Sequence, residues 1–466
     1  ETMALKKGQI FEIDIETIAF GGRGLGRLEG MAVFVDQALP GDRVRARVVR
    51  KKKRHAEARM VELLEPSADR VDPPCQYVGW CGGCKWQALK YERQLVYKRD
   101  QVEEALGHIA GIDEVPVHPT LASQQVYHYR NKMEFSCADR RWLLPAQMGD
   151  STIDTGFALG LHVPGTFYKV LDIEACLLQP DLGNQLLDTV RRHMRASGRP
   201  PYGLKSHVGF WRFLMLRHAV AHAHWRVNLV TSEEDRETVQ PLADDLMMHY
   251  PQVVSVVNNI SDRRAAIAVG EREILLAGKP VLRESVAGLQ FNVSANSFFQ
   301  TNTLGAAAMY GVVERMADLQ GTEQVLDLYS GTGAISIYLA TRAKSVVGFE
   351  WTAAAVADAE INCRLNGVTN CRFVEGDVLK QLPAWERPVD VMIVDPPRVG
   401  MHPKVLKQVI DLAPGRIVYV SCNPATLARD LLALKTCYQV AEVQPVDMFP
   451  HTWHIEAVAR LEKINP

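Results

Sequence analysis

The stretch 325–333 reads VLDLYSGTG and decides the fold class of the C-terminal part of the chain. An apolar run typical of a buried strand ends in a glycine-rich turn, and a helical pattern follows over 334–340. Glycines at this place let backbone N–H groups approach a bound ligand closely. The stretch therefore predicts a strand whose carboxyl end carries a nucleotide-like binding loop around Gly331.

Other apolar runs downstream end in the same way. VMIVDPPR (391–398) delivers Asp395 to a proline-stiffened turn, and RIVYVSCNP (416–424) delivers Cys422 to another. Strands are predicted at 325–329, 345–350, 371–374, 389–395, 416–422 and 455–461, with helical patterns between the first five. This alternation predicts an α/β, doubly wound sheet with an antiparallel edge at its end and a site at its carboxyl edge.

The acids after these strands indicate the kind of cofactor. Glu350 lies 23 residues after Asp327, close to the offset of about 20 at which an acid binds ribose hydroxyls. Ser336 stands where a dinucleotide fingerprint has its third glycine, which disfavours NAD and favours S-adenosylmethionine. Asp377, after the third strand, is either an adenine contact or an ordinary turn aspartate.

Cys422 suggests covalent chemistry, because binding a cofactor alone needs no thiol. A thiolate that adds to carbon-6 of uracil makes carbon-5 nucleophilic, and a base must later remove the carbon-5 proton. Glu456, flanked by apolar residues on a predicted strand, is the candidate base, since partial burial would raise its pKa. The competing interpretations are a buried structural cysteine and a surface glutamate.

Three of the nine cysteines, Cys75, Cys81 and Cys84, lie within ten residues. An odd number of cysteines disfavours a disulfide framework, and such crowding favours a metal site. Cys137 and Cys176 are the nearest candidates for a fourth ligand. By chemistry alone, zinc and a [4Fe–4S] cluster both remain open.

The N-terminal part has a different composition. Residues 8–66 alternate apolar and polar side chains between glycine-rich turns, which predicts a small antiparallel barrel like an OB-fold. Between Arg43 and Arg59 there are nine basic residues and one acid, Glu57. Arg43, Arg45 and Arg47 alternate with apolar residues, so they form one face of a strand. Such a face suits a phosphate backbone, although a solvated loop is the alternative.

The length of 466 residues predicts two or three domains. Pro66 and Pro73-Pro74 mark a boundary after a predicted barrel (1–66). A mixed α+β central domain (67–290) and the α/β domain (291–466), with its alternating strands and helices, follow. The net charge of -1 does not by itself indicate a nucleic-acid partner. We find no apolar run long enough for a membrane span and no signal peptide, so we expect a cytoplasmic monomer without an evident protein partner.

DPPR (395–398), SCNP (421–424) and HIE (454–456) together resemble the signature of the RNA 5-methyluridine methyltransferases. The similarity extends through SFFQTN (297–302) and the glycine loop. It implies a class I (Rossmann-like) S-adenosylmethionine domain, with Cys422 as nucleophile and Glu456 as proton acceptor. The implied cofactor contacts are Gln300, Tyr329, Gly331, Glu350, Asp377 and Asp395. Ala334 stands where many members have asparagine, so only a backbone contact is expected there.

The N-terminal part resembles one branch of that family, which has a TRAM barrel and a [4Fe–4S] cluster and acts on 23S ribosomal RNA. This resemblance implies cluster ligands Cys75, Cys81, Cys84 and Cys176, and a helix near 90–112 that packs toward the catalytic domain. A family stretch near the RNA is similar to YRNKMEF (129–135), where Arg130 and Lys132 either contact phosphates or form an ordinary strand.

The sequence thus predicts a methyltransferase acting on carbon-5 of a uridine, with 23S ribosomal RNA as the expected substrate. A transfer RNA substrate stays open. So do methylation of an exocyclic base nitrogen, which needs no thiolate, and a non-catalytic RNA-binding or redox-sensing protein. Cysteine dependence and S-adenosylmethionine binding distinguish these alternatives.

Overall fold

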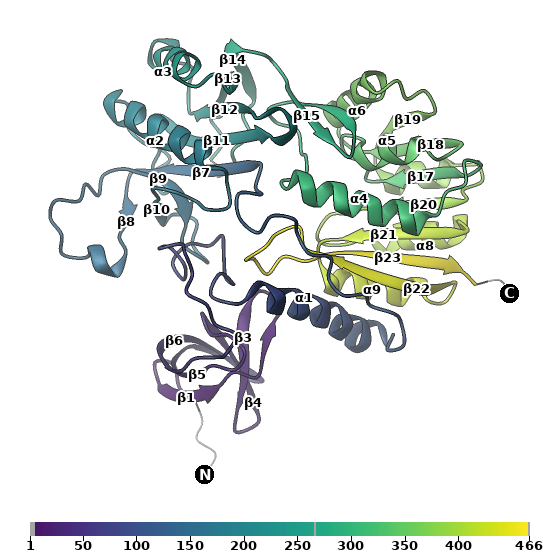
Figure 1. The fold of residues 1–466 in the computed structure, drawn as a ribbon, viewed down its shortest axis with the longest axis horizontal. Helices are drawn as coiled ribbons and strands as arrows, with labels where there is room; N and C mark the ends of the chain where they lie inside the picture. Colours follow the sequence, from purple (N-terminus) through teal and green to yellow (C-terminus); the bar gives the residue numbers. More distant parts are fainter. Residues whose placement is uncertain (1–4, 265–266, 465–466) are drawn as a thin grey trace.

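The computed structural model describes residues 5–264 and 267–464. Four β-sheets follow one another along the chain, from a six-stranded sheet at the N-terminal end to a seven-stranded sheet at the C-terminal end (Figure 1). The outermost residues of the predicted first and last domains, 1–4 and 465–466, lie outside the described residues.

The six-stranded sheet is barrel-like, and its order is β1-β5-β6-β4-β3-β2. Its strands are β1 (Ile10–Asp14), β2 (Thr17–Ala19), β3 (Arg23–Leu28), β4 (Met31–Asp36), β5 (Arg43–Lys51) and β6 (His55–Glu65). Phe11, Ile13, Val44 and Ala46 point into one apolar core, as the alternation in the sequence predicts.

The basic face of β5 is partly neutralised by acids on its neighbours. Arg45 lies 3.1 Å from Glu12 of β1 and 2.5 Å from Glu62 of β6, and Arg43 also pairs with Glu12. Such exposed pairs contribute little to stability. The face therefore carries less net charge than a count along the sequence indicates.

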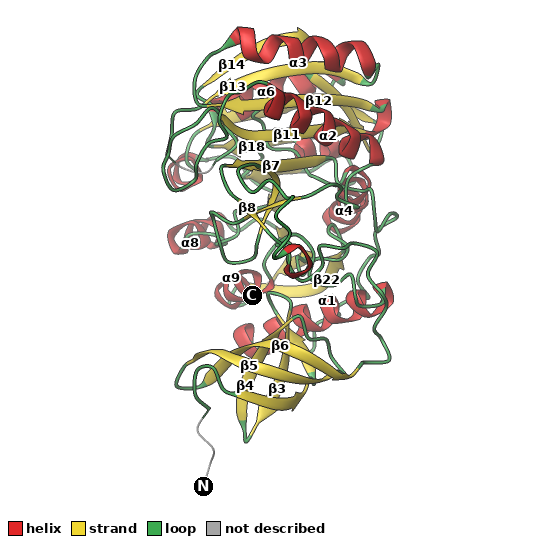
Figure 2. Ribbon diagram, turned by 90° about the vertical axis from the view of Figure 1, so that its left-hand side faces the viewer, coloured by secondary structure: helices red, strands yellow, loops and turns green. Residues whose placement is uncertain are grey.

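The central sheet has eight strands in the order β14-β13-β12-β11-β7-β9-β10-β8. They are β7 (Lys132–Ala138), β8 (Arg141–Trp142), β9 (Ala158–His162), β10 (Val170–Asp172), β11 (Trp211–Ala219), β12 (His224–Thr231), β13 (Val253–Ile260) and β14 (Arg272–Gly278). Helices α2 (Asp181–Ala196) and α3 (Arg236–His249) cover one face and share its core (Figure 2). This part is mixed α and β, as expected.

Helix α1 (Tyr91–Ala105), continued by a turn over Leu106–Ala110, packs on the seven-stranded sheet although it precedes the central sheet in the chain. Val102, Leu106 and Ala110 share one apolar core with Leu431 and Tyr438 of the C-terminal part. Both ribbon views place α1 between the barrel and this sheet (Figures 1 and 2). The helix therefore connects parts that are far apart in sequence.

The seven-stranded sheet has the order β19-β18-β17-β20-β21-β23-β22, and β23 runs antiparallel to both of its neighbours, β21 and β22, so the edge strand β22 is parallel to the first five strands. Its strands are β17 (Gln324–Leu328), β18 (Ser345–Glu350), β19 (Cys371–Glu375), β20 (Val391–Val394), β21 (Arg416–Ser421), β22 (Tyr438–Val446) and β23 (Glu456–Lys463). Strand β22 was not predicted, because its polar residues and Pro445 do not read as a strand. A two-stranded sheet, β15 (Leu282–Val286) with β16 (Leu289–Val293), precedes the seven-stranded sheet in the chain.

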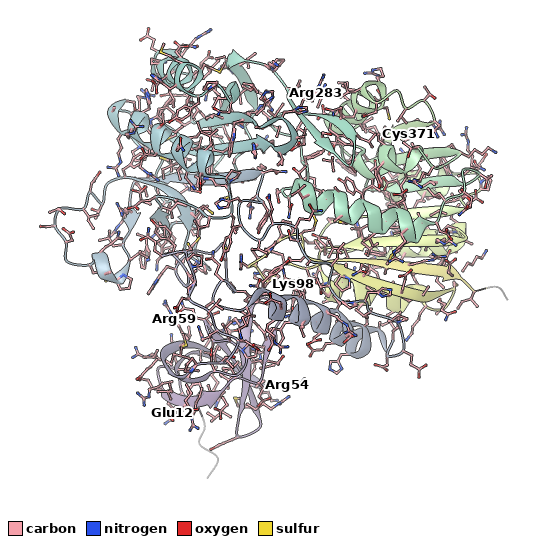
Figure 3. All side chains as sticks on the ribbon, viewed as in Figure 1. Glu12, Arg54, Arg59, Lys98, Arg283 and Cys371 are labelled. Atoms are coloured by element: carbon pink, nitrogen blue, oxygen red, sulfur yellow. The ribbon has the colours of Figure 1, made fainter. Side chains whose placement is uncertain are left out.

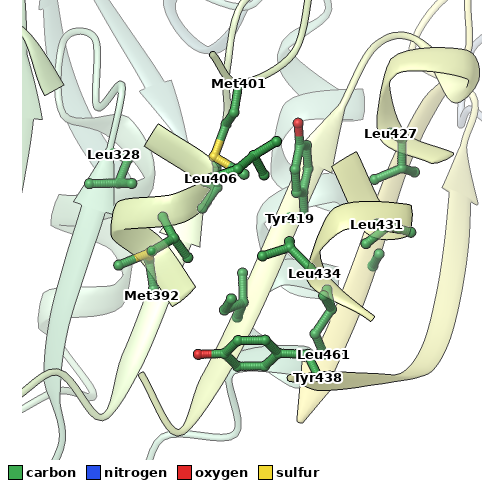
Figure 4. Close-up of a cluster of buried hydrophobic side chains, with 14 of the residues drawn as sticks. Leu328, Met392, Met401, Leu406, Tyr419, Leu427, Leu431, Leu434, Tyr438 and Leu461 are labelled. Carbon is green, nitrogen blue, oxygen red and sulfur yellow. The ribbon is translucent and has the colours of Figure 1, made fainter. Parts of the chain in front are cut away.

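Helices cover both faces of the seven-stranded sheet. They are α4 (Thr303–Ala317), α5 (Ala334–Ala340), α6 (Ala353–Leu365), α7 (Val378–Gln381), α8 (Pro403–Leu412) and α9 (Pro424–Leu434). On one face Leu406 of α8 and Leu431 of α9 pack against Met392 and Tyr419 (Figure 4). No helix within residues 5–264 or 267–464 combines the length and hydropathy needed to cross a membrane.

Candidate active site and cysteine cavity

Cys422 and Glu456 are brought together by the register of β21 and β23. Ser421 and Ala457 are antiparallel partners, so the residue after Ser421 lies beside the residue before Ala457. The two candidate catalytic residues therefore face each other at one edge of the sheet. Sequence spacing alone gives no sign of this, because 33 residues separate them.

The parallel strands deliver the other predicted residues to the same edge. Leu328 pairs with Phe349 on one side and with Val394 on the other. Tyr329 and Asp395 directly follow β17 and β20, and Glu350 is the last residue of β18, so all three lie at neighbouring strand ends.

The Cys422 thiol lies in a half-buried, acidic environment. Burial raises its pKa to about 11, and the nearby carboxyl groups of Glu456 and Asp395 act in the same direction, while Arg398 opposes them. At neutral pH the group is therefore a thiol in the free protein. A partner that neutralises the acids or removes the proton is needed before this sulfur becomes a good nucleophile.

Glu456 has the environment that general-base chemistry requires. Its side chain is 9% exposed. Burial, and after it the charge of Asp395, raises its pKa to about 8, against the opposing charges of Arg398 and Lys98. A carboxyl group poised near neutral pH can accept and release a proton in turn.

The loop after β20 is tied to the loop that carries Cys422. The carbonyl of Arg398 accepts hydrogen bonds from Asn423 Nδ2 and Thr426 Oγ1, both at 3.3 Å. Burial raises the pKa of Asp395 to about 7. Pro396 and Pro397 restrict the backbone between Asp395 and Arg398, so the loop that carries both residues is stiff at this edge.

The glycine loop has the shape of an anion or ribose cradle. Gly331 and Gly333 have φ of 55° and 79°, and Tyr329 also lies in the left-handed region with φ 65°. A Cβ on Gly333 would stand 2.5 Å from Phe373 Cζ, so only glycine fits there. Glu350 fixes the loop by accepting from the Gly331 N–H at 2.9 Å, and it keeps lone pairs free for hydroxyl donors.

Asp377 has a structural task in the fold. It is the N-cap of α7, and its carboxylate accepts from the backbone N–H of Leu379 at 3.0 Å. Tyr329 senses its charge, which contributes to a pKa of about 12 for that phenol after the larger effect of burial. The capping hydrogen bond therefore supports the interpretation of Asp377 as a turn aspartate, and its contact with adenine stays a prediction.

Gln300 is held by the YRNK segment, a connection that sequence reasoning missed. The Gln300 carbonyl accepts from Asn131 Nδ2 at 3.0 Å, and the same amide donates to Thr303 Oγ1. Thr303 in turn donates to the buried carboxylate of Glu284. Asn131, in the predicted RNA-contact stretch, thus holds the segment that carries the predicted cofactor contact Gln300. No spacing pattern in the sequence indicates this contact.

The four cysteines line one cavity of about 540 Å³ next to β7 and β9. Cys75, Cys81, Cys84 and Cys176 lie on its wall, while Cys137 is fully buried in the core of the central sheet. Arg130, Lys132 and Thr301 also line the cavity, so it reaches the segment that holds Gln300.

The thiols of Cys75, Cys81, Cys84 and Cys176 line the same cavity but do not converge on one point. Burial raises the pKa of Cys81 and of Cys84 to about 12, and each senses the charge of Cys75 and Cys176. In the part of the chain that the structure describes, no three His, Cys, Asp or Glu side chains converge closely enough to hold a metal ion. The donors fit a metal chemically, but the structure does not display a formed site.

Two models of known families match the chain. The model of the tRNA (uracil-5-)-methyltransferases matches residues 271–464, and the TRAM domain model matches residues 4–61. An uncharacterized RNA methyltransferase of Chlorobaculum tepidum is 42% identical, covering 98% of this chain and 97% of its own. Another from Halalkalibacterium halodurans is 35% identical, covering 99% and 98%.

A solved structure has the same architecture. The tRNA (uracil-54, C5)-methyltransferase of Pyrococcus abyssi, in complex with S-adenosyl-L-homocysteine, is 28% identical with a TM-score of 0.76. The match covers 97% of this chain and 100% of the Pyrococcus abyssi chain. From these matches and the site geometry, the chain belongs to the family of S-adenosylmethionine-dependent RNA uracil-C5 methyltransferases and carries an N-terminal TRAM domain.

Proposed function

We propose that this protein methylates carbon-5 of a uridine in 23S ribosomal RNA through a covalent bond between Cys422 and carbon-6. The observation that carries the proposal is the strand register that sets Cys422 beside Glu456, with Asp395 within electrostatic reach of both. Methylation of an exocyclic nitrogen would need neither a thiol nor a base at this place.

The proposed reaction uses both residues in turn. Cys422 gives its proton to solvent, and its sulfur lone pair forms the bond to carbon-6 while the ring π electrons move to the carbon-4 oxygen. S-adenosylmethionine would supply an electrophilic methyl group when bound. Carbon-5 gains that group through the returning enolate electron pair, and the electrons of the broken sulfur–methyl bond stay on the cofactor sulfur, which leaves as a thioether. Glu456 then takes the carbon-5 proton, the C5–C6 double bond forms again, and the Cys422 thiolate leaves. The base gains one methyl group and loses one proton.

Arg398 is placed to assist both residues. Its charge lowers the pKa of Cys422 and that of Glu456, against the larger effect of burial. It therefore favours a thiolate before addition and a carboxylate before proton removal. The target base has to be unpaired or flipped out to reach this edge.

The proposed cofactor contacts are Gln300, Tyr329, Gly331, Glu350, Asp377 and Asp395. Support comes from the left-handed glycine turn and from Glu350, whose carboxylate is already oriented by the Gly331 and Thr352 N–H groups. Free lone pairs on Glu350 suit ribose hydroxyls.

We further propose that Cys75, Cys81, Cys84 and Cys176 hold a [4Fe–4S] cluster. Support comes from their common cavity, which is roomier than one ion needs, and from the absence of Cys137 from its lining. The methyl transfer needs no electron, so the cluster would organise the RNA-facing segment around Arg130 and Lys132. Zinc is the alternative occupant.

Transfer RNA is the second candidate substrate. The Pyrococcus abyssi protein that matches this chain over its full length is named for uridine 54 of tRNA. The ribosomal assignment rests on the resemblance of barrel and cysteine spacing together. A direct comparison of the two RNAs is therefore part of the test.

The test is to mix anaerobically purified protein with S-adenosylmethionine and RNA in which 5-fluorouridine replaces uridine, and to run a denaturing gel. Fluorine at carbon-5 does not leave as a proton, so the methylated adduct is expected to stay on Cys422. Cys422→Ala is the matched control. A lack of adduct with both 23S and transfer RNA would reject the covalent mechanism, and adduct with transfer RNA alone would reject the ribosomal assignment.

A further inference from the structure

Helix α1 turns a stripe of polar side chains toward the segment that leads into Glu456. Tyr91, Gln94 and Lys98 lie at positions i, i+3 and i+7, on one face of the helix. All three reach residues 447–451, which follow β22 and precede β23. A polar stripe on the buried face of a helix is unusual and asks for an explanation.

Lys98 is the centre of this stripe. Its side chain is fully buried, and Nζ lies 2.6 Å from Asp447 Oδ1 and 3.1 Å from the Phe449 carbonyl. Tyr91 donates to the other Asp447 oxygen at 2.8 Å, and the Phe449 N–H donates to Oδ1. Figure 3 labels Lys98 on α1, where the helix passes between the barrel and the seven-stranded sheet.

Gln94 holds the next part of the same segment. Its amide oxygen accepts from the His451 N–H at 2.9 Å, and its nitrogen lies 3.1 Å from His451 Nδ1. His451 has φ 66°, a backbone conformation that needs support from its surroundings. The segment before Glu456 is thus fastened to α1 at Asp447, Phe449 and His451.

Stability alone does not explain a buried lysine–aspartate pair. Removing two charges from water costs about as much as their attraction returns, and apolar substitutes are often equally stable. The position of the pair suggests a second task, because Lys98 and Glu456 sense each other's charge.

We infer that Lys98 is a positioning residue for the base Glu456. It anchors residues 447–455 through Asp447, and its positive charge favours the carboxylate form of Glu456 when the carbon-5 proton has to be removed. This inference rests on the proposed function and extends it to a residue of the helix next to the barrel.

The charged groups around Glu456 come from several elements. Asp395 and Arg398 face it from the loop after β20, and Lys98 faces it from α1. Cys422 faces it from the end of β21. Asp395 opposes the carboxylate form, so the two cations counterbalance one acid.

Three more groups face Lys98 besides Glu456. Asp447 forms the direct pair, and His451 and His454 both sense the Lys98 charge. Burial lowers the pKa of each histidine to about 4, so both are neutral in the range where Glu456 titrates. Burial lowers the pKa of Lys98, and the direct ion pair with Asp447 opposes this effect and favours the charged ammonium. Among the groups that the structure describes around Glu456, Lys98 and Arg398 are the cations that lower its pKa.

The experiment separates adduct formation from proton removal. RNA with tritium at carbon-5 of uridine releases tritium to water when Glu456 acts, whereas 5-fluorouridine RNA reports adduct formation alone. Both rates are measured against pH in single turnovers. We compare wild type, Lys98→Met, Lys98→Met/Asp447→Asn and Arg99→Met. Arg99 is the matched control, since it is the next residue on α1 and pairs with Glu103 at the surface.

Both Lys98 variants are expected to shift the pH midpoint of tritium release upward by about 1 unit. The double variant matters most, because it leaves no unpaired buried charge and keeps hydrogen-bond partners for Tyr91 and Phe449. Hydrogen exchange of residues 447–455 is expected to become faster in Lys98→Met. Arg99→Met is expected to match wild type in every respect.

A double variant with the wild-type midpoint would overturn the inference and leave Lys98 with a structural role only. Unchanged exchange of residues 447–455 in Lys98→Met would overturn the anchoring. If wild type formed no adduct and released no tritium with any RNA, the proposed function would fail and the inference with it. The two failures can be told apart by the wild-type protein, which forms adduct and releases tritium if only the inference about Lys98 is wrong.

Discussion

Cys422 stands alone at the sheet edge, whereas Cys75, Cys81, Cys84 and Cys176 share one cavity. Burial raises the pKa in both places, to about 11 for Cys422 and to about 12 for Cys81 and Cys84. The neighbours differ. Cys422 faces two carboxyl groups and an arginine, while the cavity cysteines face chiefly one another.

The comparison shows two ways in which a buried thiol with a raised pKa can lose its proton. A lone thiol beside a titrating glutamate and an arginine can be activated for one reaction step and then protonated again. A group of thiols that raise one another's pKa stays protonated until a bound cation lowers the pKa of each thiol. The first arrangement matches the proposed catalytic role of Cys422, and the second matches the proposed cluster.

The largest effect is expected from removing the lone thiol. Cys422→Ala takes away the nucleophile, so methylation should fall by about 10⁴-fold or more, and no adduct should form. Single-turnover transfer of labelled methyl groups to RNA measures this. Cys437→Ala is the control, because it removes a half-buried thiol from the same domain away from the site. Normal methylation by Cys422→Ala would show that Cys422 is not the nucleophile, and the proposed difference in role between Cys422 and the cavity cysteines would be wrong.

Glu456→Gln should separate the two halves of the reaction. The amide has nearly the same shape but accepts no proton, so the adduct is expected to form and to accumulate. Release should slow by about 10²–10⁴-fold. Denaturing gels with unmodified RNA would reveal the trapped complex. Rapid turnover without an accumulated adduct would remove Glu456 from the role of base.

The cavity side of the comparison is tested by a pair of alanine variants. Cys176→Ala should lose bound metal and destabilise the central part, whereas Cys137→Ala should keep it, since Cys137 lies in the core and not on the cavity wall. Iron, zinc and acid-labile sulfide are measured in anaerobically purified protein. Zinc without sulfide would replace the cluster with a single-ion site, and equal metal in both variants would exclude Cys176 as a ligand.

The strand ends at the carboxyl edge of the seven-stranded sheet could be predicted from the sequence because strand periodicity and turn residues are local signals. Gly331, Asp395 and Cys422 follow apolar runs that the structure forms as strands, and Glu350 ends another such strand. Glu456 was predicted from its motif, but the register that places it beside Cys422 belongs to the folded sheet.

Contacts between distant segments could not be predicted. Lys98 and Asp447 are 349 residues apart, and a lysine on a charged helix reads as a solvent-exposed residue. The choice of Cys176 over Cys137 likewise rested on resemblance, since spacing left both open. Strand β22 was missed because its Glu442, Gln444 and Pro445 obscure the period of two.

The smallest effect concerns stability, and it isolates the burial of one acid. The pKa of Glu456 is raised from its usual value of 4.5 to about 8, so the neutral form is the one that the fold favours. Below about pH 4.5 this group adds its full contribution to stability. As the pH rises toward 8, the unfolded chain ionises more readily than the folded one, and that contribution is lost.

Glu456→Gln should therefore unfold at the same temperature as wild type near pH 4.5 and at a higher one near pH 8, by about 5 °C. The difference between the two proteins is the informative quantity, because His451 and His454, with pKa values lowered to about 4, change stability in the opposite direction and cancel in it. Thermal melts across this pH range measure it. Glu360→Gln, on the exposed face of α6, should show no such divergence. A constant difference at all pH values would mean that Glu456 is not held neutral by burial, and its suitability as a base near neutral pH would lose its physical ground.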